Sequence, residues 1–62
     1  MKLRITIDLD NAAFEGLPGI EVARILRRLA DTADEAGILE PGELDDVRDI
    51  NGNTVGEAKV TR

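Results

Sequence analysis

The chain has 62 residues, with thirteen acidic and eight basic side chains, a formal net charge of −5, and no cysteine or histidine. A chain of this length forms a single domain, residues 1–62, and without cysteine, histidine or serine it has no disulfides, no Ser-His-Asp or Cys-His nucleophile and no usual zinc or haem site. The net negative charge disfavours direct binding to a nucleic-acid backbone.

Residues 2 to 10 alternate between apolar and polar side chains, which predicts a half-buried β-strand. Its apolar side comprises Leu3, Ile5, Ile7 and Leu9. The following segment, Asp10 to Gly16, begins with two capping or turn residues and ends in glycine, which predicts a single helical turn or tight loop. We expect this segment to place Phe14, the only aromatic residue, in the core.

Residues 20 to 36 have the apolar spacing of an amphipathic helix. The stripe comprises Val22, Ile25, Leu26, Leu29, Ala30, Ala33 and Ala36. Gly37 follows where a helix C-cap is expected, and Ile38 is placed to make the hydrophobic contact that often accompanies such a cap.

The last third of the chain predicts a hairpin, with strands at residues 45–50 and 55–60 joined by Asn51-Gly52-Asn53-Thr54. A four-residue loop pairs Arg48 with Glu57, Asp46 with Lys59, Ile50 with Val55 and Val47 with Ala58. A two-residue loop instead sets Asp46 opposite Glu57. Because like charges on facing positions are unfavourable, we expect the four-residue loop. The predicted fold is α+β, in the order β-α-β-β, with a three-stranded antiparallel or mixed sheet and one helix on its apolar face.

Most of the negative charge falls between residues 29 and 49, where eight acids accompany one base, Arg48. The acids are Asp31, Asp34, Glu35, Glu40, Glu43, Asp45, Asp46 and Asp49. Two interpretations are open. In the first, Asp31 pairs with Arg27 and Arg28 at helical spacing and the loop acids serve solubility. In the second, all eight carboxylates form a row that a basic partner accepts as it accepts phosphates.

Two segments resemble the start of a calcium-binding loop, Asp8 to Asn11 and Asp49 to Asn53. In the second segment, glycine occupies the fourth position instead of the sixth, and the twelfth position is Val60 where a glutamate is required. Turn chemistry and helix capping explain both segments better. We therefore expect no metal or other cofactor. The small chain is also unable to enclose a pocket around a carboxylate pair, so we expect no enzymatic activity.

Three segments carry a resemblance to known proteins: Ile7 to Phe14, Ala23 to Asp31 and Arg48 to Gly56. Together they resemble a group of small acidic proteins that bacterial phages, prophages and plasmids carry. In size, acidity and lack of catalytic residues the chain is also similar to anti-CRISPR proteins, many of which block a basic surface of a CRISPR complex. That second likeness is one of type, and it assigns no site residue.

The leading functional hypothesis is therefore a non-enzymatic, stoichiometric inhibitor from a mobile element, of the anti-CRISPR type. Its partner would be a basic protein surface such as that of a CRISPR effector subunit, and its binding site the eight acids from Asp31 to Asp49. No apolar run is long enough to cross a membrane, and the N-terminal alternation is unlike a signal peptide, so we expect the protein in the bacterial cytosol. We expect it to be a monomer or a weak homodimer. The alternative is a structural or assembly protein that self-associates through its exposed sheet.

Overall fold

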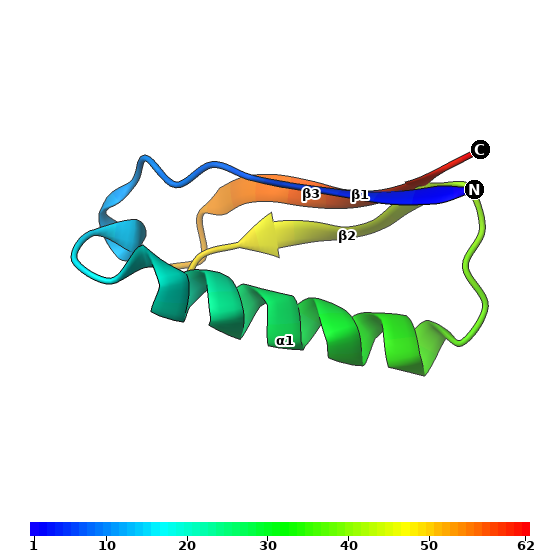
Figure 1. Cartoon of the computed structure of the whole chain (residues 1–62), viewed down its shortest axis with the longest axis horizontal. Helices are drawn as coiled ribbons and strands as arrows, with labels where there is room; N and C mark the ends of the chain where they lie inside the picture. The colour runs from blue at the N-terminus through cyan, green and yellow to red at the C-terminus, as the bar shows by residue number, and fades with distance from the viewer.

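One helix packs along one face of a three-stranded antiparallel sheet in the computed structural model, which describes all residues 1–62 (Figure 1). The elements, in chain order, are β1 (Lys2–Ile7), the short 3₁₀ helix η1 (Ala12–Phe14), α1 (Pro18–Ala36), β2 (Gly42–Arg48) and β3 (Thr54–Thr61). The predicted α+β fold with the order β-α-β-β is confirmed.

The strand order is β1-β3-β2, so the last strand lies in the centre and β1 and β2 are the two edges. β1 pairs with β3 without interruption, from Lys2 opposite Thr61 to Ile7 opposite Gly56. Gly56 is required there, because a Cβ at this position would overlap the backbone oxygen of Thr6. A residue with a side chain at this position would displace β1.

The hydrophobic core lies between α1 and the inner face of the sheet. Its buried members are Phe14, Ile25, Leu29, Val47, Val55 and Ala58. Phe14 reaches the core from η1, whose first turn is capped by Asn11, and Asn11 Oδ1 accepts a hydrogen bond from Ala13 N–H at 2.8 Å. The predicted helical turn and the predicted role of Phe14 as a core anchor are both confirmed.

The helix begins two residues earlier than expected, at Pro18, whose fixed φ suits the first turn of a helix. It ends as predicted, with Gly37 at a positive φ of 69° and its N–H donating to Ala33 C=O. The contact predicted for Ile38 is wrong, because that side chain is 82 % exposed.

The predicted hairpin register is also wrong. The structure sets Asp46 opposite Glu57, Glu43 opposite Lys59 and Val47 opposite Gly56, with irregularities on either side. Two local interactions explain why the like-charge pair is tolerated. Arg48 Nε donates to Asp46 Oδ2 at 2.9 Å along the same strand, and the connecting loop, residues 49–53, is closed by hydrogen bonds of its own. Loop chemistry thus determines the register.

Candidate functional site

The loop between β2 and β3 is organised around one buried carboxylate, that of Asp49, which is only 4 % exposed. Its Oδ1 accepts hydrogen bonds from the backbone N–H groups of Asn51 and Asn53, both at 2.9 Å. Its Oδ2 accepts from Asn11 Nδ2 at 2.6 Å and from Asn53 Nδ2 at 3.2 Å. One carboxylate therefore closes the loop and ties it to the cap of η1.

The charge of Asp49 is stabilised by these donors. Desolvation by burial acts to raise the pKa of the Asp49 carboxyl, but the hydrogen bonds donated by Asn53, Asn11 and Asn51 outweigh it and hold the pKa below its ordinary value. The turn chemistry predicted for this segment is what the structure shows. Asp49 therefore belongs to the internal framework and presents no free oxygen of the kind that a partner-binding acid offers.

A second buried carboxylate, that of Glu21, joins the first turn of α1 to the same loop. Glu21 Oε1 accepts from Arg24 Nε at 2.6 Å, and Oε2 accepts from Ile50 N–H at 2.8 Å. Arg24 Nη2 continues to the backbone oxygen of Arg48 at 3.2 Å. The hydrogen bond from Arg24 lowers the pKa of Glu21, burial opposes it, and the bond from Ile50 adds to the lowering. Glu21 and Arg24 are three residues apart, so they lie on the same side of the helix.

Three large apolar side chains stand exposed around this framework: Leu17 at 71 %, Ile20 at 67 % and Ile50 at 70 %. They line an open hollow of about 420 Å³ together with Ala13 and the Glu21–Arg24 pair. The sequence interpretation missed this hollow. The sequence does contain one sign of an exposed apolar surface here. Ile20 lies outside the apolar stripe of the helix, so its side chain was not expected to be buried in the core.

The other three acids of α1, Asp31, Asp34 and Glu35, form a separate, exposed group at the other end of the helix. Asp34 follows the buried Ile25 by nine residues, two and a half turns, so it lies on the side of the helix away from the sheet. Asp31 and Glu35 are exposed as well. The chain contains only two salt bridges, Glu21–Arg24 and Asp46–Arg48. The pairing of Asp31 with Arg27 and Arg28, which the solubility interpretation invokes, is absent.

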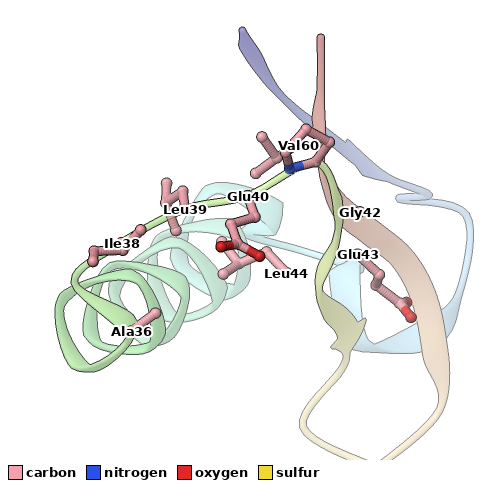
Figure 2. A pocket seen from close by; sticks show the side chains of 9 residues that line it. Ala36, Ile38, Leu39, Glu40, Gly42, Glu43, Leu44 and Val60 are labelled. Carbon is pink, nitrogen blue, oxygen red and sulfur yellow. The ribbon is translucent and has the colours of Figure 1, made fainter.

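A hollow is lined by the end of α1 and the start of β2, and Figure 2 shows its side chains. In this view, Glu40 and Glu43 lie on opposite sides of β2. Glu40 lies on the helix side of β2. Glu43 lies on the other side, where it is opposite Lys59. Glu40 therefore lies between the helix end and β2, whereas Glu43 belongs to the outer face of the sheet.

The eight acids grouped by the sequence consequently divide into three sets. The helix-end acids, which are exposed near the C-terminus of α1, are Asp31, Asp34, Glu35 and Glu40. Glu43, Asp45 and Asp46 lie on β2, where Asp45 is half-buried opposite Ala58 and Asp46 is bonded to Arg48. Asp49 is buried. The predicted continuous row of eight carboxylates is not formed.

No cluster of three or more acidic side chains is close enough to hold a metal ion. The one long helix, α1, does not combine the length and hydrophobicity that a membrane-spanning helix needs. Comparisons of the chain with protein-family models, curated proteins and solved structures found no match.

Proposed function

We propose that the protein is a non-enzymatic, stoichiometric inhibitor that uses the helix-end acids to occupy a basic nucleic-acid-binding surface on another protein. The class of target that we propose is a CRISPR effector complex, in keeping with the resemblance in type to anti-CRISPR proteins. The observation that supports the proposal is the exposure of Asp31, Asp34 and Glu35 without any ion pair, near the end of a helix where negative charge is unfavourable.

The electrostatics of the helix favour a cationic partner. Asp34 and Glu35 lie in the last turn, where the helix dipole places partial negative charge, and no basic residue accompanies them there. Lysine and arginine side chains brought by a partner would neutralise the carboxylates and interact favourably with the dipole. Because exposed charges are screened over a Debye length of about 8 Å at physiological salt, binding should weaken as salt is added.

Displacement of labelled nucleic acid from purified CRISPR effector complexes tests the proposal. Wild-type protein should displace the nucleic acid from a susceptible complex at one equivalent. The triple variant D31K/D34K/E35K should need at least about tenfold more protein, because each lost or reversed charge contact at an interface weakens binding.

A second triple variant, D10K/E15K/E57K, is the matched control. It makes the same change in net charge at three other exposed acids, none of which accepts a side-chain hydrogen bond or forms a salt bridge. This control should displace nucleic acid almost as well as the wild type. Equal loss in both variants would mean that net charge alone is responsible, and displacement from none of the complexes would contradict the proposed target.

The alternative function, self-association through the exposed face of the sheet, is not favoured by the residues on that face. Arg4, Lys59 and Glu43 form one row across the three strands, and Thr6, Glu57 and Asp46 form the next. Charged rows of this kind are typical of a solvated face. The edge of the sheet has a different character and supports a separate inference.

A further inference from the structure

The free edge of β1 offers an uninterrupted row of unpaired backbone groups. Asp8 N–H donates to Val55 C=O at 2.7 Å, so the backbone of residue 8 points toward β3. Since donor direction alternates along an antiparallel strand, the even-numbered residues of β1 bond to β3. The N–H and C=O groups of Leu3, Ile5 and Ile7 therefore face outward, where no strand of the same chain lies.

The two edges of the sheet differ in how they are protected. β2 is irregular at two places, between Glu43 and Asp45 and between Val47 and Arg48, and its residues include three acids. Bulges and charges of this kind prevent edge-to-edge pairing. β1 has no irregularity in its six residues. Only the β1 edge is open to a further strand.

The inner side of β1 is also incompletely covered. α1 packs against β2 and η1, which leaves Leu3 47 % and Ile5 40 % exposed. Between β1 and the helix runs a groove of about 190 Å³, and all eight of its lining residues are hydrophobic, among them Leu26 and Ala30. The apolar groove and the adjacent edge of β1 therefore expose both apolar side chains and unpaired backbone groups to water.

We propose that a second copy of this chain covers the edge, by antiparallel pairing of β1 with β1 about a two-fold axis at Ile5. This register sets Ile5 opposite Ile5 and Leu3 opposite Ile7 on the inner face. It sets Lys2 opposite Asp8, a pair of opposite charge, on the outer face. The outward backbone groups of Leu3, Ile5 and Ile7 then bond to one another, and the two sheets become one of six strands.

Neighbouring registers are less favourable. A two-fold axis at Arg4 sets the Arg4 side chains of the two copies opposite each other. A register shifted by one residue sets the apolar side chains of one β1 strand opposite the polar side chains of the other. An axis at Thr6 requires Leu9 to continue the strand, but Asp10 N–H donates to Asp8 Oδ1 at 2.9 Å and the chain turns there. The strand itself ends at Ile7, which suits the register centred on Ile5.

Cysteine variants of the full chain test both the dimer and its register, because the chain has no cysteine of its own. Facing residues of a hydrogen-bonded antiparallel pair lie about 5.5 Å apart between Cα atoms, which suits a disulfide. Ile5→Cys should therefore cross-link into a covalent dimer on mild oxidation. Arg4→Cys and Thr6→Cys are the matched controls, since each pairs with the other position across the axis and the equivalent cysteines lie about 8 Å apart.

Sedimentation of the uncross-linked protein provides the second measurement. The wild type should be a dimer, and its association should persist in high salt because apolar contacts and backbone hydrogen bonds supply most of it. Ile5→Lys should be monomeric with unchanged circular dichroism, because Ile5 lies outside the buried core cluster. A wild type that stays monomeric up to millimolar concentration, or cross-linking at Arg4→Cys or Thr6→Cys equal to that at Ile5→Cys, would overturn the proposal.

Discussion

The acids at the two ends of α1 are used in opposite ways. Near its start, Glu21 and the adjoining Asp49 are buried, and together they accept hydrogen bonds from arginine, asparagine and three backbone N–H groups. Near its end, Asp34 and Glu35 are exposed and form no salt bridge. Carboxylates of the same chemistry thus stabilise the fold at one end of the helix and are exposed without an ion pair at the other.

The largest effect should come from removing the loop carboxylate. Asp49→Ala leaves the N–H groups of Asn51 and Asn53 and the amide of Asn11 without their acceptor, so the melting temperature should fall by roughly 10 °C or more. Asp49→Asn keeps one acceptor oxygen and should lose less. Asp34→Ala should leave the melting temperature nearly unchanged, and equal losses for Asp49→Ala and Asp34→Ala would abolish the distinction between the two ends.

Acid should destabilise the protein through the buried pair. The pKa of Glu21 lies below its ordinary value of 4.5 and that of Asp49 below 3.8, so both contribute stability that is complete above those values and is lost as pH falls through the folded-state pKa. Chemical denaturation at a series of pH values should show the free energy of unfolding falling below pH 4.5. The double variant E21Q/D49N should be less stable at neutral pH but should show a flatter dependence on acid. If the variant and the wild type lose stability in parallel, other groups carry the effect.

At the other end of the helix, reversing charge should stabilise the protein. Lysine at position 34 or 35 interacts favourably with the helix dipole, so each of Asp34→Lys and Glu35→Lys should raise the free energy of unfolding by about 0.3 to 1 kcal/mol at low ionic strength. High salt should remove most of the gain. Destabilisation by either substitution would show that these acids, like Asp49, have a role in the fold.

The smallest effect is expected at Ile50, whose backbone N–H donates to Glu21 while its side chain is 70 % exposed. Ile50→Ala should change the free energy of unfolding by less than about 0.5 kcal/mol, as is usual for surface substitutions. Urea denaturation is the appropriate measurement. A larger loss would mean that the exposed side chain packs in solution against Leu17 or Ile20.

The kinds and order of the elements were predictable because each has a local signal, but two strand boundaries were not. β1 ends at Ile7 where the prediction continued to residue 10, and β2 spans Gly42–Arg48 where 45–50 was predicted. The alternation of β1, the apolar stripe of α1 and the positive φ of Gly37 all depend on residues within one segment. The hairpin register was predicted wrongly because cross-strand charge was weighed without the hydrogen bonds of Asp49. Three of those bonds come from Asn51 and Asn53 inside the loop, and the fourth comes from Asn11, which is 38 residues away in sequence. No period or spacing in the sequence indicates the contact with Asn11.

The division of the eight acids could not be predicted for a related reason. A run of acids shows where negative charge lies along the sequence. Whether each carboxylate is exposed depends on which strand is central in the sheet and on which strands the helix covers. A single helix, about 10 Å wide, covers about two strands that are 4.8 Å apart, so one strand of three stays partly uncovered. The sequence identifies the apolar side of β1 but not its position at the edge.

The most direct test of the contrast between the two ends of α1 makes two measurements on each of two variants, D31K/D34K/E35K and Asp49→Ala. The first is displacement of nucleic acid from a susceptible effector complex, and the second is thermal unfolding. We predict that D31K/D34K/E35K unfolds no earlier than the wild type yet displaces poorly. Asp49→Ala should unfold early yet displace normally at temperatures where it is folded. Full displacement by the triple lysine variant would contradict the assignment of the helix-end acids to a partner.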